Sequence, residues 1–414
     1  MASSPKFFLQ CAWCKSKYSA ESKTRICSSC AGSLEIIYDY EKIKETGSSL
    51  PIDNSKPGIW KYFSLLPATE NTRIISLGEG DSPYHLIEKV GASLGIKQLY
   101  VKDESRNPTC SFKDRKSTCS ITRGVEEGYT RVVAATAGNA GSSVAAYAAK
   151  ADIESYILAF QGISQTKLAK LLAYNAKVFL TNASTGDVLE FVSKVCKEFG
   201  LLNCSAASRY NPYVKEGAKT AVFEIYQATN GDLPDWIIIP LGGGGNLAAY
   251  YKGLQELNQL GLITRFPRLV GVQGTECAPV VQAFEKNLDA RKIPKVKNPR
   301  TIAHSILDDW APDGDVALEA IRQTKGVAIS VTDDEIVESM KILSSKEAIF
   351  AEPSSAAPLA ALKKLLADKT VDPNESVATI CTGFGLNQPE ATINAYPMPE
   401  KLTLDLAEFG KYVM

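Results

Sequence analysis

Short apolar runs alternate with amphipathic stretches along most of the chain. Runs rich in Val, Ile, Leu and Ala that end at turn residues predict strands, and longer segments with helical spacing of apolar residues predict helices. The expected strands cover residues 99–101, 132–135, 155–158, 177–180, 236–239, 269–272 and 376–380. The expected helices cover residues 142–150, 165–173, 187–199, 246–257, 332–345 and 354–367. Apolar strands joined through helices indicate a mostly parallel sheet buried on both faces, so we expect an α/β fold.

Composition agrees with a globular protein that has a large core. The chain has 414 residues, 45% hydrophobic content, and 46 Lys+Arg against 46 Asp+Glu residues, which is typical of a globular protein with two or three domains. The even charge balance gives no reason to expect a nucleic-acid partner. No apolar run reaches the roughly 20 residues that cross a bilayer, and the first residues lack a signal-peptide core. We therefore expect a cytoplasmic protein with no membrane segment.

Four cysteines form two pairs near the N-terminus. Cys11 and Cys14 are separated by twelve residues from Cys27 and Cys30, which is close to the spacing of a four-thiolate zinc ribbon. Free thiols or metal ligands are expected because a reducing cytosol disfavours isolated disulfides. Four protein ligands leave no open position for water or substrate. We therefore predict a structural Zn²⁺ that supplies much of the folding free energy of residues 8–38.

The strongest chemical signal is Lys113 in the segment Ser-Phe-Lys-Asp-Arg, at an expected junction of strand and helix. Lysine forms Schiff bases with carbonyl compounds, and burial lowers its pKa enough for the amine to attack. Glycine-bearing loops follow three expected strands, at residues 136–141, 240–246 and 381–385. The second loop holds four successive glycines, which let backbone N–H groups approach a phosphate. A lysine facing such a loop suits an aldehyde cofactor with a phosphate tail, and we predict pyridoxal 5'-phosphate with Lys113 as the catalytic residue.

In this order the motifs resemble those of the threonine synthase family of fold-type-II pyridoxal-phosphate enzymes. The resemblance covers nearly the whole chain and includes further segments at residues 58–62, 77–80, 102–104, 107–109, 211–213, 216–220, 271–273, 301–303 and 352–356. It implies a tryptophan synthase β-like fold of two α/β subdomains behind the zinc ribbon. The expected parts are a ribbon at 1–40, a linker and lead-in at 41–70, a catalytic domain at 71–395 with its smaller subdomain near 128–205, and a tail at 396–414.

The resemblance also implies roles for individual residues. Lys113 would carry the cofactor, Asn139 would bond the ring oxygen, and Thr382 would face the ring nitrogen. The expected cofactor site comprises Phe112, Lys113, Asn139, Gly242, Gly243, Gly244, Gly245, Asn246 and Thr382. The expected substrate site comprises Ser111, Thr136, Ala140 and Arg209.

Threonine synthases convert O-phosphohomoserine to threonine and phosphate, and the resemblance implies this lyase reaction and a homodimer. The departures from the family pattern fall where the substrate is recognised. Val214 stands where the family usually has a phosphate-binding arginine, and Arg209 stands where it has a serine. Because a guanidinium binds phosphate bidentately, we expect Arg209 to supply the missing charge. The other departures are Cys110, Lys116, Phe384 and Asn387.

Some alternative functions would share the cofactor and the catalytic lysine. A cysteate synthase, which joins O-phosphoserine to sulfite, and a serine or threonine dehydratase would both use Lys113 and the same cofactor. A silent scaffold that binds a partner through its zinc ribbon would not need the intact lysine motif. His85 and His304 lie outside the matching loops, and we interpret both as structural or surface residues.

Overall fold

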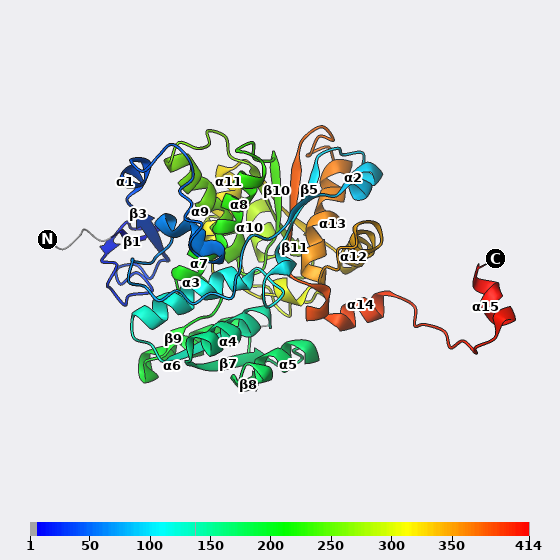
Figure 1. Cartoon of the computed structure of the whole chain (residues 1–414), viewed down its shortest axis with the longest axis horizontal. Helices are drawn as coiled ribbons and strands as arrows, with labels where there is room; N and C mark the ends of the chain where they lie inside the picture. The colour runs from blue at the N-terminus through cyan, green and yellow to red at the C-terminus, as the bar shows by residue number, and fades with distance from the viewer. Residues whose placement is uncertain (1–5, 137, 414) are drawn as a thin grey trace.

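Three sheets organise residues 6–136 and 138–413, which the computed structural model describes. The smallest sheet lies at the N-terminal end, and the two larger sheets lie one above the other in Figure 1, with helix α3 between them. Helix α3 (Lys113–Glu126) packs against α4 (Asn139–Ala151) and α7 (Tyr213–Ala218). The predicted α/β fold is thus confirmed, and the lysine segment lies between its two parallel layers.

The N-terminal sheet is antiparallel and has the order β2-β1-β3. Its strands are β1 (Phe7–Cys11), β2 (Lys17–Tyr18) and β3 (Leu34–Tyr38). Strand side chains point alternately to the two faces of a sheet, so every second residue of β1 and β3 is buried. Helix α1 (Tyr40–Lys44) and the 3-10 helix η1 (Gly58–Leu65) then lead into the body of the molecule.

The six-stranded sheet has the order β12-β11-β10-β13-β5-β4. All its pairings are parallel except that of the edge strand β4 with β5. The strands are β4 (Tyr84–Leu86), β5 (Leu99–Asp103), β10 (Trp236–Pro240), β11 (Arg268–Gly274), β12 (Val327–Val331) and β13 (Val377–Cys381). The four strands expected in this part of the chain are confirmed, whereas β4 and β12 at the two edges were not predicted. Edge strands are buried less fully, so their apolar signal is weaker.

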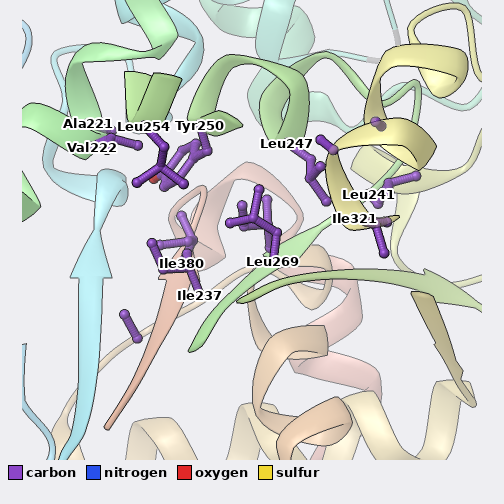
Figure 2. Close-up of a cluster of buried hydrophobic side chains, with 14 of the residues drawn as sticks. Ala221, Val222, Ile237, Leu241, Leu247, Tyr250, Leu254, Leu269, Ile321 and Ile380 are labelled. Carbon is purple, nitrogen blue, oxygen red and sulfur yellow. The ribbon is translucent and has the colours of Figure 1, made fainter. Parts of the chain in front are cut away.

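Helices cover both faces of this sheet. Figure 2 shows one face, where Ile237, Leu269 and Ile380 of the strands meet apolar side chains of α8, α9 and α11. Trp236 and Ile238 point to the opposite face and pack against α2, α12 and α13. The covering helices are α2 (Glu88–Leu94), α8 (Thr220–Ala228), α9 (Gly245–Gln259), α10 (Pro279–Glu285), α11 (Gly314–Gln323), α12 (Asp333–Glu347) and α13 (Pro353–Ala367).

The four-stranded sheet is entirely parallel and has the order β8-β7-β6-β9. Val132 and Ala134 face helix α4, whereas Val133 and Ala135 face α6, so this sheet is also covered on both sides. Its elements are β6 (Arg131–Thr136), β7 (Glu154–Phe160), β8 (Lys177–Thr181), β9 (Leu202–Asn203), α5 (Gln165–Ala173) and α6 (Thr185–Phe199). The loops after β6, β10 and β13 consequently reach the edge of a sheet where ligands bind in open α/β folds.

The remaining elements are short. They are η2 (Glu104–Arg106), η3 (Ala290–Lys292), η4 (His304–Ile306), η5 (Gly385–Asn387), α14 (Pro389–Ala395) and α15 (Leu406–Val413). Helix α15 stands apart from the rest of the molecule in Figure 1. Among the described helices, none combines the length and apolarity that a bilayer crossing requires.

Candidate active site

One cavity lies where the loops after β6, β10 and β13 meet the start of α3. It brings together every residue of the expected cofactor site, although these residues come from four separate parts of the sequence. Thr136 and Ala140 line the same cavity, and Ala137 of the first loop lies outside the described residues. The grouping follows from topology, because the carboxyl ends of parallel strands collect at one edge of a sheet.

Lys113 is the first residue of helix α3, and its side chain is half-buried in this cavity. Its Nζ lies 4.5 Å from the centroid of the Phe112 ring. Burial lowers the pKa of Lys113 to about 8, while the negative charge of Asp308 acts in the opposite direction. A substantial share of this amine is therefore neutral near physiological pH, which is the form that attacks a carbonyl.

The tetraglycine loop between β10 and α9 has the shape of an anion site. Gly244 has a φ of +91°, in the left-handed region, and a Cβ at that position would lie 2.6 Å from the Asp313 carbonyl oxygen. Helix α9 begins at Gly245, so its first N–H groups point toward the cavity without helical partners. Both amide atoms of Asn246 are buried and have no hydrogen-bond partner within the described part of the chain. Since an unsatisfied buried amide is costly, these atoms fit a bound polar group such as a phosphate.

Asn139 and Thr382 also line the cavity. The Asn139 Nδ2 donates to the two carboxylate oxygens of Glu352 at 2.9 and 3.0 Å and to the Ser305 Oγ at 3.2 Å. The Thr382 Oγ1 lies 3.0 Å from the Ser355 Oγ. Both side chains are therefore held by buried neighbours before any ligand binds, which fits their expected contacts with a planar ring.

The four expected substrate residues have different positions. The Thr136 Oγ1 accepts bonds from the backbone N–H groups of Gly138 and Gly141 at 2.9 and 3.0 Å, so it also shapes its own loop. Ser111 is not among the residues that line the cavity, and its buried hydroxyl has no partner among the described residues.

Arg209 points away from the cavity. Its guanidinium donates to the Ala31 carbonyl oxygen at 3.2 Å and lies 5.9 Å from the centroid of the Trp310 ring. Both neighbours belong to a hollow between the cysteine-bearing segment and the body. This position gives no support to the predicted contact between Arg209 and a substrate phosphate, which stays a prediction.

Three charged residues of the cavity were not assigned to the site from the sequence: Lys116, Asp308 and Asp313. Burial raises the pKa of Asp308 to about 6. The Asp313 carboxylate accepts bonds from the N–H and Oγ of Ser208 and from the N–H of Arg209, at 2.7 to 2.8 Å. Both acids follow the motif of residues 301–303 on irregular backbone, where no periodic pattern marks them. Lys116 was visible only as a departure from the family pattern.

The four N-terminal cysteines converge on one point. Their Sγ atoms all lie within 4.8 Å of one another, and the closest pairs, Cys11 with Cys30 and Cys14 with Cys27, are 3.4 Å apart. A Cβ at Gly32 would lie 2.9 Å from the Cys11 Sγ, so glycine is needed beside the cluster. Four converging thiols fit a tetrahedral metal site.

The two histidines lie outside the cavity lining. His85 is exposed on the edge strand β4. His304 lies in η4, and burial lowers its pKa. Their positions agree with the interpretation of both as structural or surface residues.

Comparisons with known proteins agree with this geometry. The family described as pyridoxal-phosphate dependent enzyme matches residues 75–383. The threonine synthase of Methanocaldococcus jannaschii is 40% identical over 96% of this chain and 97% of its own length. That of Methanosarcina acetivorans is 36% identical over 98% of this chain and 99% of its own length. Maize serine racemase has the same fold, with a TM-score of 0.61 and 20% identity over 80% of this chain and 91% of its own.

Proposed function

Because the chain belongs to the threonine synthase family of pyridoxal-phosphate-dependent enzymes, we propose that it converts O-phosphohomoserine to threonine and phosphate. The observation that carries this proposal is the near full-length similarity to threonine synthases at 36% and 40% identity. The cavity around Lys113 supports it, since it gathers an amine, a glycine loop and two oriented polar side chains.

The cavity residues fit the cofactor that the family implies. The tetraglycine loop and Asn246 would hold its phosphate, Asn139 and Thr382 would hold its ring, and Lys113 would bind its aldehyde carbon. When bound, pyridoxal phosphate supplies an electron sink that stabilises negative charge at the substrate Cα. The fit rests on the two unpartnered amide atoms of Asn246 and on the glycine backbone, which leaves room for a close approach.

The chain's own residues supply the proton transfers and the orientation. The Lys113 amine takes the proton from the substrate Cα and delivers protons to neighbouring carbons as phosphate leaves, since its lowered pKa allows it to act in both directions. Glu352 fixes the direction of the Asn139 amide. Asp308 keeps the Lys113 pKa from falling further, because its carboxylate favours the charged amine.

The proposal extends to the N-terminal segment and to the whole protein. The converging thiols of Cys11, Cys14, Cys27 and Cys30 support one structural Zn²⁺. A cytoplasmic homodimer is the corresponding prediction for the assembly, and it rests on the sequence and the family resemblance.

A serine or threonine dehydratase is the second candidate. Asp308 and Asp313 place two carboxylates in the cavity, and Val214 offers no charge nearby. Beside the leaving group, these carboxylates would disfavour a phosphate dianion and tolerate a hydroxyl, whereas Lys113 and Lys116 of the same cavity act in the opposite direction. Cysteate synthase chemistry would require a phosphate site as well, so the same observation weighs against it.

The deciding experiment compares substrates on one enzyme preparation. Phosphate release is measured from O-phosphohomoserine and from O-phosphoserine with and without sulfite, and keto-acid formation is measured from serine and threonine. Threonine and phosphate in equal amounts from O-phosphohomoserine support the proposal. Keto acid from serine or threonine, with no phosphate from any phospho amino acid, would replace it with the dehydratase.

Lys113→Ala is the matching variant. We expect turnover to fall by several orders of magnitude and the visible absorbance of the bound cofactor to disappear, because covalent binding and proton transfer are both lost. Lys150→Ala, at an exposed position near the end of α4, is the control and should keep both properties. Near-normal turnover by Lys113→Ala would move the reactive amine elsewhere.

A further inference from the structure

Lys116 is a buried cation in the cavity that the proposed reaction does not use. It lies one turn after Lys113 on helix α3, and its side chain is 4% exposed. Its Nζ donates to the Ala206 carbonyl oxygen at 3.1 Å and lies 5.3 Å from the centroid of the Phe112 ring. The two lysine amines therefore lie near the same aromatic ring and line the same cavity.

The charge of Lys116 is not neutralised by an ion pair within the described residues, although Asp313 lies nearby. Both oxygens of the Asp313 carboxylate accept bonds from Ser208 and Arg209 instead. An ammonium group has three donors, and the Ala206 carbonyl occupies one of them. Burial and the charge of Lys113 lower the pKa of Lys116 to about 7, which shows how poorly its surroundings compensate the charged form.

The space beside Lys116 is where an anion would be held. A Cβ at Gly245 would lie 2.5 Å from the Asp313 Oδ2 and 3.1 Å from the Lys116 Nζ, so the carboxylate and the amine both reach the loop at the point where helix α9 begins. The N–H groups of that first turn favour negative charge. Val214 lines a small second cavity together with Lys116 and carries no charge. A cation with free donors and a helix N-terminus thus converge on one region, next to a carboxylate whose oxygens already accept bonds from Ser208 and Arg209.

We propose that Lys116 is a phosphate-binding residue whose ammonium group pairs with a phosphate monoester in the active-site cavity. This inference rests on the proposed function, because that function supplies two possible sources of the phosphate: the cofactor and the amino-acid substrate. Lys116 would supply the phosphate-binding charge that the sequence analysis assigned to Arg209. The guanidinium of Arg209 faces the cysteine-bearing segment instead. An ammonium–phosphate bond formed away from water is a strong one, and its loss weakens binding roughly tenfold to hundredfold.

The test uses the full chain with Lys116→Met, which keeps an unbranched side chain one atom shorter than lysine and removes its charge. Lys116→Gln, which keeps a donor for the Ala206 carbonyl, is the second variant. Lys116→Arg should restore most of the affinity, and Lys150→Met is the exposed control. Calorimetric titrations measure the binding of pyridoxal phosphate and of pyridoxal to the cofactor-depleted chain, and the binding of inorganic phosphate to the holoenzyme. The KM for O-phosphohomoserine is measured in parallel.

The two sources give different results. If Lys116 binds the cofactor phosphate, Lys116→Met weakens the binding of pyridoxal phosphate roughly tenfold to hundredfold and leaves the binding of pyridoxal unchanged. If it binds the substrate phosphate, the affinity for inorganic phosphate and the KM change by that factor while the cofactor affinity does not. Parent-like values in all titrations would overturn the proposal, as would a lower melting temperature of both uncharged variants with unchanged phosphate affinities. The titrations need no turnover, so they stay decisive even if the enzyme consumes no phospho amino acid.

Discussion

At the scale of single residues, the site depends on how nearby carboxylates adjust the pKa values of two lysines that line the cavity. Lys113 and Lys116 share helix α3 and are both desolvated, yet their pKa values are about 8 and about 7. Asp308, Glu352 and Asp313 all favour the charged form of Lys113, whereas Lys167 opposes it. For Lys116, the charge of Asp313 favours the charged form, whereas those of Lys113 and Lys215 oppose it. Burial is thus the main cause of both shifts, and the facing acids partly offset it at Lys113.

This balance predicts a shift in the pH dependence of cofactor capture. Only the neutral amine attacks an aldehyde, so the rate at which the cofactor-depleted chain takes up pyridoxal phosphate should rise with pH through about 8, the pKa of Lys113. Asp308, whose pKa is about 6, is ionised there and raises that of Lys113. Asp308→Asn should consequently move the midpoint to lower pH. The visible absorbance followed across the pH range measures it.

The exposed first-turn residue Asp334 of α12 offers a control for this experiment. Asp334→Asn should leave the midpoint where the parent has it. A midpoint that stays in place or moves to higher pH in Asp308→Asn would mean that this carboxylate does not govern the amine.

At the scale of elements, the cysteine-bearing sheet is attached to the catalytic body through polar groups. The Tyr38 hydroxyl of β3 donates to the Glu216 carboxylate at 2.7 Å, and the Lys252 Nζ of α9 donates to the Ile36 carbonyl oxygen at 2.6 Å. The Trp13 Nε1 donates to the Asp315 carboxylate at 3.1 Å. Because the small sheet has few apolar residues of its own, these bonds and the metal must supply much of its stability.

The zinc assignment predicts about one Zn²⁺ per chain in metal analysis, because four thiolates close the coordination shell. Cys27→Ser should release the metal and unfold the N-terminal sheet, which limited proteolysis would detect as cleavage within the first forty or so residues. Cofactor absorbance should persist, since no cysteine of the cluster lines the cavity. Cys196→Ser in α6 is the control. A full complement of zinc after loss of both Cys11 and Cys27 would refute the assignment.

Tyr38 offers a test of the attachment itself. Tyr38→Phe removes a buried hydrogen bond to a charged carboxylate, and we expect the free energy of unfolding to fall by about 1.5–3 kcal/mol. Denaturant unfolding followed by tryptophan fluorescence measures the change. Tyr156 is the control, because its hydroxyl donates to Glu154 at an exposed position. Tyr156→Phe should lower the free energy of unfolding much less. Equal losses in the two variants would show that the Tyr38 contact is no stronger than a surface bond.

At the scale of the whole molecule, the features that could be predicted from the sequence are those that local hydrophobic patterns determine. The central strands and the helices that follow them have strong periodic signals, and topology then brings the loops of residues 136–141, 240–246 and 381–385 to one cavity. The direction of Arg209 was not predictable, because a position in the chain does not tell which way a loop turns its side chain. Asp308 and Asp313 could not be assigned to the site from the sequence for a similar reason, because the tertiary packing of an irregular segment determines their positions.

The C-terminal segment gives a prediction at this scale. Met398, Leu404 and Leu406 are highly exposed, and α15 stands apart from the catalytic body in Figure 1. Removal of residues 398–414 should therefore leave the melting temperature, the cofactor affinity and the turnover unchanged, because little buried surface is lost. Thermal unfolding and steady-state kinetics of the truncated chain measure these properties. A fall in any of them would show that the segment contacts the body or another copy in solution.

The spacing of Lys113 and Lys116 on one helix face has a consequence for chemical selectivity. Two neutral amines in one cavity would compete for the aldehyde of the incoming cofactor, and burial lowers the pKa of both Lys113 and Lys116. A phosphate beside Lys116 would favour its protonated form and thereby remove it from this competition. The phosphate tail of the cofactor would then keep the Lys116 amine protonated and unreactive. Binding of the phosphate would thereby direct the aldehyde to Lys113.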